Sequence, residues 1–195
     1  MADTAPPRVR TAGEADRARL ISLITLAFAT DPMARWAMPD AADYLAAMPD
    51  FADAFGGPGI ATGGALICDG GGALWLPPGE HPDSERMGAI MQGRLPDALA
   101  GELGAVFEQM DGFHPEAPHW YLPLIGVDPD RQGRGCGAAL MRAAVERCDR
   151  EGSLAYLESS NPRNISLYLR HGFEILGTVQ EGSSPVMTPM LRRPA

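Results

Sequence analysis

Residues 124–138 read LIGVDPDRQGRGCGA, and this stretch decides the fold. Three glycines stand at alternate positions, at 133, 135 and 137. Glycine permits positive φ angles and a close approach of backbone to ligand, and a following helix directs its unpaired N–H groups and positive dipole end to the same point. The stretch therefore predicts a strand, an anion-binding turn suited to phosphate oxygens and a helix, with Arg131 and Arg134 adding charge-assisted hydrogen bonds.

The sequence on either side extends this unit into a crossover. Residues 119–127 (HWYLPLIGV) predict a long strand, in which Pro123 and Gly126 disfavour a regular ladder and indicate a bulge or an unpaired edge. A helix is expected at 136–150 and another strand at 154–158. A strand, helix, strand crossover implies that the two strands run parallel.

The remaining segments are expected to complete an α/β domain. Asn161-Pro162 supplies an N-cap and a proline at the first helical position, and Gly172 ends that helix. The other expected elements are helices at 14–29 and 40–55, a hairpin of 64–68 and 73–76 around 69–72, a helical region at 83–110 broken at Gly93 and Pro96, and closing strands at 173–179 and 185–191.

The composition excludes several classes of function. The chain has 195 residues, which favours a single domain 1–195, and its 16 basic residues are all arginine. Without lysine there is neither a Schiff-base lysine for PLP nor a P-loop lysine. A net charge of −9 argues against nucleic-acid binding.

The charge is divided unevenly along the chain. Residues 1–117 carry 17 acids and 7 arginines, hence −10, whereas residues 118–195 carry 8 acids and 9 arginines, hence +1. The second part is therefore expected to hold a phosphate-bearing ligand. The acids of the first part, especially in segments 40–53 and 102–116, favour a cationic partner or merely coat a solvated surface.

The cysteines and histidines indicate no metal site. Three cysteines without CxxC spacing predict neither disulfides nor a zinc site, and His114 and His119 lack a helical ligand spacing. Cys136 stands near a helix start, where a thiol pKa can fall, but a small filler is the expected role. No apolar run approaches 20 residues and no signal-peptide pattern begins the chain, so we expect a cytoplasmic protein without membrane association.

A dinucleotide site is one interpretation of the glycine turn. Gly133-x-Gly135-x-x-Ala138 satisfies GxGxxG/A, and Glu158 stands 20 residues later, where a ribose-binding acid is expected. A nicotinamide- or flavin-dependent oxidoreductase is therefore an alternative. The turn from Asp128 to Gln132 and the few elements after Glu158 disfavour it.

Two motifs resemble the GNAT superfamily of N-acetyltransferases. Gln132, Gly135 and Gly137 fill its acyl-CoA loop pattern Q/R-x-x-G-x-G/A, and residues 161–173 are similar to its N-x-x-x-x-x-x-Y-x-x-x-G-F segment. Residues 75–79 show a weaker similarity to bacterial members of the puromycin N-acetyltransferase type. The resemblance implies a mixed, largely antiparallel central sheet with helices on both faces and a bulged strand splayed from its parallel neighbour.

The resemblance also implies a function. Residues 118–195 would bind acetyl-CoA as cosubstrate, without metal, PLP or nicotinamide, and residues 1–117 would bind a small cationic amine that attacks the thioester directly in a ternary complex. It is compatible with a homodimer. A non-catalytic acyl-CoA sensor on the same fold is a second alternative. The residues implied in cofactor binding are Ile125, Gly126, Val127, Gln132, Gly133, Arg134, Gly135, Gly137, Ala138, Asn161 and Asn164.

Tyr168 and Glu158 are the candidate catalytic residues. Tyr168 lies two helical turns from Asn161 on the same face, and its reference pKa near 10 suits an acid that protonates a leaving thiolate. Glu158 ends a strand and could accept a proton from the amine, directly or through water, but a solvated strand end explains it equally well. His119 and Tyr121 share a strand face and are alternative bases.

Overall fold

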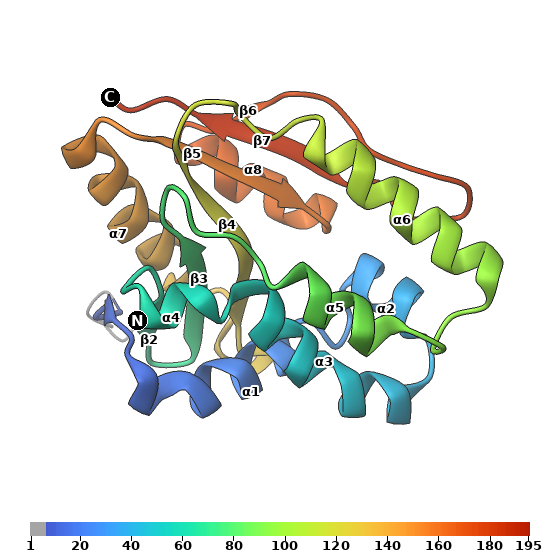
Figure 1. The fold of residues 1–195 in the computed structure, drawn as a ribbon. Coiled ribbons are helices and arrows are strands. Elements are labelled where there is room, and N and C mark those ends of the chain that lie inside the picture. The colour runs from blue at the N-terminus through green and yellow to red at the C-terminus, as the bar shows by residue number, and fades with distance from the viewer. Residues whose placement is uncertain (1–6) are drawn as a thin grey trace.

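The computed structural model describes residues 7–195, which contain one seven-stranded sheet (Figure 1). The strand order is β1-β2-β3-β4-β5-β7-β6, and every neighbouring pair is antiparallel except β4 and β5. This confirms the predicted mixed sheet and the parallel crossover. The strands are β1 (Arg10–Thr11), β2 (Leu66–Cys68), β3 (Gly71–Leu76), β4 (His119–Val127), β5 (Leu154–Ser159), β6 (Glu174–Ile175) and β7 (Thr188–Arg192).

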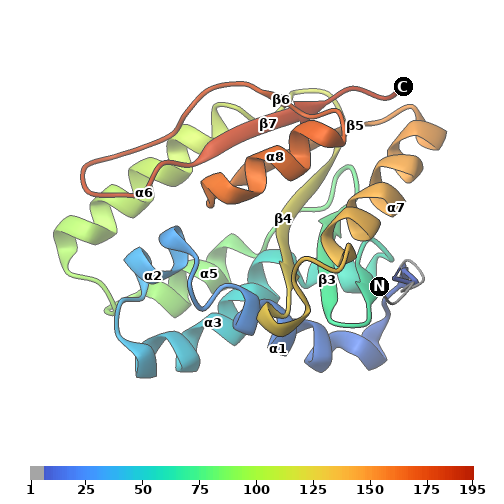
Figure 2. The same cartoon turned by 180° about the vertical axis from the view of Figure 1, so that it is seen from behind.

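Helices cover both faces of the sheet (Figures 1 and 2). Alternate side chains of β3 decide the partners: Leu74 packs with α1 and α3, whereas Trp75 packs in the cluster that contains α7 and α8. The helices are α1 (Arg17–Ala27), α2 (Pro32–Ala37), α3 (Ala41–Gly56), α4 (Pro58–Ala61), α5 (Ser84–Met91), α6 (Asp97–Asp111), α7 (Cys136–Glu151) and α8 (Pro162–Arg170), with 3-10 turns η1 (Glu14–Asp16) and η2 (Pro129–Arg131).

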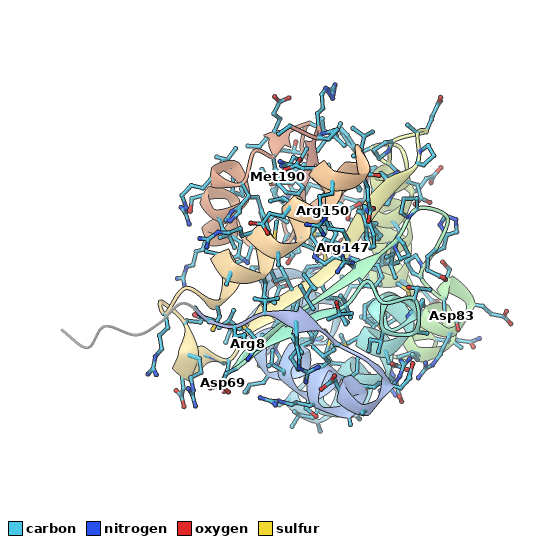
Figure 3. All side chains as sticks on the ribbon, turned by 90° about the vertical axis from the view of Figure 1, so that its left-hand side faces the viewer. Arg8, Asp69, Asp83, Arg147, Arg150 and Met190 are labelled. Carbon is cyan, nitrogen blue, oxygen red and sulfur yellow. The ribbon has the colours of Figure 1, made fainter. Side chains whose placement is uncertain are left out.

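A cation–π contact also holds α7 to the sheet. The Arg147 guanidinium lies 4.8 Å from the centroid of the Trp120 ring. Figure 3 shows Arg147 on α7, on the same helix as Arg150. The Trp120 indole N–H donates to Glu151 at 2.7 Å, so two side chains of α7, Arg147 and Glu151, contact the same ring of β4. These contacts fix the helix whose N-terminus carries the glycine turn.

Strand β4 separates from β5 halfway along its length. The parallel pairing runs from His119 to Leu122 and stops there, while the pairing with β3 continues to Val127 with an irregularity opposite Leu74–Leu76. Pro123 stands at the point of separation and has no N–H to donate. A bulge or an unpaired edge was predicted here, and the structure has a register irregularity toward β3 and an unpaired edge toward β5.

The hydrogen-bond alternation shows which groups face the open edge of β4. Asp128 N–H donates to the Gly70 carbonyl at 2.9 Å, so this pair is a hydrogen-bonded one. Hydrogen-bonded and non-bonded pairs alternate in an antiparallel ladder, so Gly126 bonds to β3. The N–H groups of Ile125 and Val127 consequently face away from β3, toward the gap that β5 leaves.

Most expected elements are present, including the break between α5 and α6. The two closing strands are shorter than predicted. The strand expected at 173–179 is β6 (Glu174–Ile175), and the one expected at 185–191 is β7 (Thr188–Arg192). Val179 and Met187 form a single isolated bridge. These two side chains pack against α6 instead of extending the sheet. Within residues 7–195, no helix has both the length and the apolar character to cross a bilayer.

Candidate active site

The glycine turn forms the N-terminus of α7. Gly133 and Gly135 have φ angles of 73° and 83°, and Gly135 caps the helix without a side chain, as expected for this turn. A Cβ on Gly133 would meet nothing within 4 Å, and one on Gly135 only Pro7, at 3.9 Å. The backbone conformation and not packing therefore requires these glycines. The first-turn N–H groups have no partner inside the helix and are free for an anion.

A cavity runs from this turn along the open edge of β4; we call it the glycine-turn cavity. All the residues predicted for cofactor binding except Arg134 line this cavity. Arg131, Arg163 and Arg170 also line it, and the last two were not predicted. Arg163 and Arg170 are seven residues apart on α8 and so lie on the same helix face, which is the sequence pattern that could have identified them. Three guanidinium groups beside a helix N-terminus suit a ligand with several phosphates.

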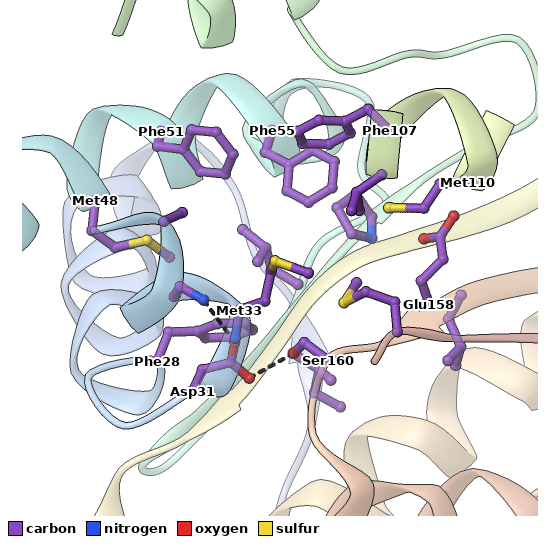
Figure 4. A pocket seen from close by; sticks show the side chains of 18 of the residues that line it. Phe28, Asp31, Met33, Met48, Phe51, Phe55, Phe107, Met110, Glu158 and Ser160 are labelled. Carbon is purple, nitrogen blue, oxygen red and sulfur yellow. Dashed lines mark hydrogen bonds between the residues drawn. The ribbon is translucent and has the colours of Figure 1, made fainter. Parts of the chain in front are cut away.

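A second, apolar cavity lies on the other side of the splayed strands, among α2, α3 and α6 (Figure 4). Of its 24 lining residues, 19 are apolar, including four phenylalanines and six methionines. The only charged side chains in the lining are Asp31 and Glu158. This composition is typical of a site for a small organic molecule.

The two cavities meet where β4 leaves β5. Five residues line both cavities: Phe28, Asp31, Ile125, Asn164 and Tyr168. They come from the α1–α2 region, β4 and α8, so the junction depends on both parts of the chain. A ligand in one cavity can therefore react with a ligand in the other at this point.

Tyr168 is buried at the junction. Its side chain projects from α8, and burial, with a smaller contribution from the Asp31 charge, raises its pKa above 10. The phenol thus stays protonated at neutral pH and is available as a hydrogen donor. Asn161, its predicted companion, caps α8 by accepting the Arg163 N–H at 3.1 Å, so its amide NH₂ is left for a ligand.

Glu158 is buried in the apolar cavity, with a side chain only 2% exposed. This excludes the solvated strand end as its environment. His114 Nε2 lies 3.2 Å from its Oε1, but the angles are not those of a hydrogen bond, so Oε1 has no hydrogen-bond partner among the described residues. Burial, with a smaller contribution from Glu158, raises the pKa values of Tyr121 and Tyr156, which therefore remain neutral and are poor bases.

Two histidines connect Glu158 to the surface. His114 Nδ1 lies 3.3 Å from His119 Nε2, and His119 Nδ1 lies 2.9 Å from the Ala117 carbonyl. A carbonyl only accepts, so His119 carries its hydrogen on Nδ1 and accepts at Nε2. His114 then donates from Nδ1 and directs Nε2 at Glu158. Burial lowers the pKa of His119, which favours the neutral form of this ring.

Asp31 is a junction residue that the sequence analysis did not single out. One carboxylate oxygen accepts the N–H groups of Met33 and Ala34 and caps α2, and the other accepts the Ser160 hydroxyl at 2.6 Å. Burial raises its pKa, and no neighbouring cation offsets this effect. Ser160 is 129 residues away in sequence, so local spacing gave no signal of the contact.

The acids of segments 40–53 and 102–116 were expected to attract a cationic acceptor, but none of them lines the apolar cavity. Its negative charge comes from Asp31 and Glu158 instead. The helices α3 and α6 turn Met48, Phe51, Val106 and Met110 inward instead. An amphipathic helix buries its apolar face and leaves its acids outside. Asp53, for example, pairs with Arg17 and Arg86.

Gly126, predicted for cofactor binding, and Cys136, expected as a small filler, both have packing roles. A Cβ on Gly126 would lie 2.6 Å from Ala27 Cβ, so glycine there allows α1 to cross β4. Cys136 is buried and donates to the Asp69 carbonyl at 3.4 Å, consistent with a small filler. Residues 7–195 contain no cluster of three or more His, Cys, Asp or Glu side chains suited to a metal ion.

Comparisons with known proteins agree on one family. Residues 79–173 match the model of the acetyltransferase (GNAT) family. The chain is 41% identical over 54 residues, 28% of its length, to an uncharacterised N-acetyltransferase of Schizosaccharomyces pombe. It is 34% identical over 74 residues, 36% of its length, to an L-methionine sulfoximine/L-methionine sulfone acetyltransferase of Pseudomonas aeruginosa. These matches span only 22% and 41% of the two relatives.

A solved structure extends the similarity to nearly the whole chain. The structure, histone acetyltransferase HPA2 and related acetyltransferase from Corynebacterium glutamicum, superposes with a TM-score of 0.70 at 25% identity. The alignment covers 98% of each chain. The N-terminal helices that line the apolar cavity are therefore part of a shared fold.

Proposed function

Because the chain belongs to the GNAT acetyltransferase family, we propose that it transfers an acetyl group from acetyl-CoA to the primary amine of a small acceptor. The observation that carries this proposal is the junction of the two cavities. It brings an anion-binding turn and an apolar pocket to one point, where Tyr168 and Ile125 line both cavities. Direct attack in a ternary complex requires this arrangement.

The residues around the glycine turn fit the diphosphate of acetyl-CoA. The open space over Gly133 and Gly135 leaves room for phosphate oxygens next to the backbone. Cys136, Gly137 and Ala138 present first-turn N–H groups, and the helix dipole favours an anion there. The arginines of the cavity would neutralise the remaining phosphate charge.

The open edge of β4 would hold and polarise the thioester. Ile125 and Val127 direct N–H groups into the gap, and a pantetheine arm can pair with such an edge as a strand would. Ile125 lies at the junction, so its N–H is the candidate donor to the thioester oxygen. Removal of such a donor costs about 3–4 kcal/mol in other enzymes.

Glu158 would remove a proton from the acceptor ammonium. Its unpartnered Oε1 faces His114 Nε2, which can take the proton onward while His114 passes its Nδ1 hydrogen to His119. The relay ends at the half-buried His119, which then carries a hydrogen on both ring nitrogens and releases one to solvent. These transfers restore Glu158 as a base, and the relay is reset when His114 and His119 again carry their hydrogens on Nδ1.

Tyr168 would donate to the sulfur as the carbon–sulfur bond breaks. Its raised pKa makes it a reluctant acid before that moment, so the proton moves only when thiolate charge develops beside it. Asp31, which also faces the junction, contributes to this raised pKa. Product amide and free coenzyme A thiol then balance the reaction.

Two measurements test this proposal. We expect acetyl-CoA to bind in calorimetry and a panel of primary amines to release coenzyme A thiol. Binding without turnover of any amine would instead establish a non-catalytic acyl-CoA sensor. Binding of NADH without binding of coenzyme A would establish the dinucleotide alternative.

A further inference from the structure

We infer that Ser183 is a positioning residue for the acceptor: it joins α6 to α2, two walls of the apolar cavity, and holds them together around a bound amine. This inference rests on the proposed acetyl transfer and adds a residue outside the cavity that controls binding of the acceptor. Ser183 belongs to residues 177–187 of the connection between β6 and β7, which we call the strap. The strap lies along α6 in both views of the fold (Figures 1 and 2).

The strap contacts α6 from the C-terminal end of this helix to its N-terminal end. Next to the C-terminal end, a Cβ on Gly177 would lie 2.8 Å from the Phe113 ring, so glycine allows the strap to pass close to this ring. Farther along, the Gln109 side-chain amide donates to the Glu181 carboxylate at 3.0 Å. The buried cluster that the two segments share consists of Val106, Met110, Val179 and Met187. These contacts attach the strap to α6 over most of its length.

At the N-terminal end of α6, Ser183 connects three parts of the chain. Its backbone N–H and its hydroxyl donate to the Glu102 carboxylate at 2.7 and 2.8 Å. That second bond uses the only hydroxyl hydrogen, so the hydroxyl oxygen is left to accept the Trp36 indole N–H at 3.1 Å. The preceding Gly182 has a φ angle of 49°, and a Cβ there would collide with the Glu102 carboxylate. One serine hydroxyl thus bridges α6 and α2.

The bridge lies directly outside the apolar cavity. Ala37 lines the cavity from α2 and follows Trp36 in the chain. Leu103 lines it from α6 and follows Glu102. The three bridge residues themselves line neither the apolar cavity nor the glycine-turn cavity. The bridge therefore sets the positions of α2 and α6 without contact with either ligand.

Fixed walls favour binding of the amine, because a mobile wall must be ordered when a ligand binds and this ordering costs free energy. The helix α2 has only six residues, and a helix of this length is unstable on its own in water. Its hydrogen bond to the strap is part of what holds it in place. Loss of the bridge should therefore weaken binding of the amine and leave acetyl-CoA, which would occupy the other cavity, unaffected.

The first test is kinetic and uses Ser183→Ala, which removes both hydroxyl bonds, with hexylamine as the probe amine. We expect the KM for hexylamine to rise about fivefold, and kcat and the KM for acetyl-CoA to change by less than about twofold. Ser183→Thr keeps a hydroxyl and should restore the wild-type KM. The matched control is Ser22→Ala, an exposed serine whose hydroxyl donates to the Ala18 carbonyl within α1. An unchanged hexylamine KM in Ser183→Ala, or an equal rise in the KM for acetyl-CoA, would overturn the inference.

A double-mutant cycle tests the bond between the strap and α2. Trp36→Phe keeps an aromatic ring but removes the indole N–H that donates to Ser183. Because the two groups form one bond, the double variant should have the hexylamine KM of Ser183→Ala alone. A double variant in which the two effects multiply would show that Trp36 and Ser183 act independently, and this would refute the bridge.

Hydrogen–deuterium exchange decides the inference even if the proposed function fails. If neither hexylamine nor another amine releases thiol although acetyl-CoA binds, acetyl transfer is wrong. Exchange measured by mass spectrometry without any amine should still be about fivefold faster in α2 and α6 of Ser183→Ala than in wild type, and unchanged in α7. Equal exchange in the two proteins would overturn the inference. A uniform increase that includes α7 would also refute it, because it would reflect a loss of global stability.

Discussion

Tyr168 owes its proposed chemistry to its burial at the junction of two cavities. Burial raises the pKa of its phenol, and Asp31 adds a negative charge nearby. Both effects keep the proton on the hydroxyl before the reaction. The hydroxyl can then donate its hydrogen to the departing thiolate, whose negative charge the ground-state thioester lacks.

Replacement of Tyr168 by phenylalanine tests this role. Because the ring and its packing against Phe173 remain, we expect the KM for acetyl-CoA to change less than threefold. We expect kcat to fall about 100-fold, the usual contribution of a general acid. Steady-state kinetics by thiol release measures both constants. An unchanged kcat would remove Tyr168 as the acid.

The histidine relay predicts a pH dependence. The pKa of His119 is lowered by burial, so the ring becomes protonated only below pH 6.5, and a protonated His119 cannot accept a hydrogen from His114. Wild-type kcat should therefore fall as the pH decreases past a midpoint below 6.5. His119→Phe should lower kcat about tenfold at pH 7.5 and remove this midpoint. An identical pH profile in the variant would show that protons leave Glu158 by another path.

At the residue scale, local spacing identified some site residues and missed others. Tyr168 and Asn161 are separated by two turns of one helix, which the sequence shows directly. Asp31 and Ser160 meet only in the folded protein, and His114 comes from a loop whose path no periodicity predicts. His119 was considered as an alternative base and His114 only as a metal ligand, because the contact of His114 with Glu158 depends on how the loop before β4 meets β5.

At the scale of elements, the N-terminus of α7 is the proposed phosphate-binding site. Gly137→Asp places a negative charge in its first turn, where it suits the helix dipole but repels a diphosphate. We expect the melting temperature to stay within about 2 °C and acetyl-CoA affinity to fall at least tenfold in calorimetry. The matched control is Ala98→Asp, an exposed residue at the same position of α6, which should bind acetyl-CoA normally. Equal affinity in both variants would contradict phosphate binding at this helix.

The pairing of α7 with β7 predicts a pH-dependent stability. Asp149 accepts two hydrogen bonds from the buried Arg192, at 2.7 and 2.8 Å, and this partner lowers the pKa of Asp149. A lowered folded-state pKa gives stability that is present above the unfolded pKa of about 3.9 and is lost as the pH falls through the folded value. Asp149→Asn should therefore cost about 2 kcal/mol in urea unfolding at pH 7. The difference from wild type should shrink at pH 3, and a constant difference would refute the pairing as its cause.

Element prediction succeeded where a pattern was local and long. The helix from Cys136 and the hairpin around Gly70 follow from apolar periodicity and turn residues. Helices of four to six residues, such as α2 and α4, are too short to show a period. The closing strands were predicted too long because Val179 and Met187 are apolar but pack on α6, a contact that only the tertiary structure supplies.

At the scale of the whole molecule, the separation of β4 from β5 places the site. The gap exposes one strand edge to both cavities, with α7 and α8 on one side and α2, α3 and α6 on the other (Figures 2 and 4). The charge division of the chain agrees with a phosphate ligand on the C-terminal side. The acceptor side receives its charge from Asp31 and Glu158 alone, because the helix acids face outward.

A crystal structure of the complex with coenzyme A measures most directly whether this gap is an acyl-CoA site. We expect the diphosphate within hydrogen-bonding distance of the backbone N–H groups of residues 133–138, and the sulfur beside the Tyr168 hydroxyl at the mouth of the apolar cavity. Coenzyme A bound elsewhere, or a diphosphate that leaves the turn vacant, would contradict the proposed site and the chemistry that depends on it.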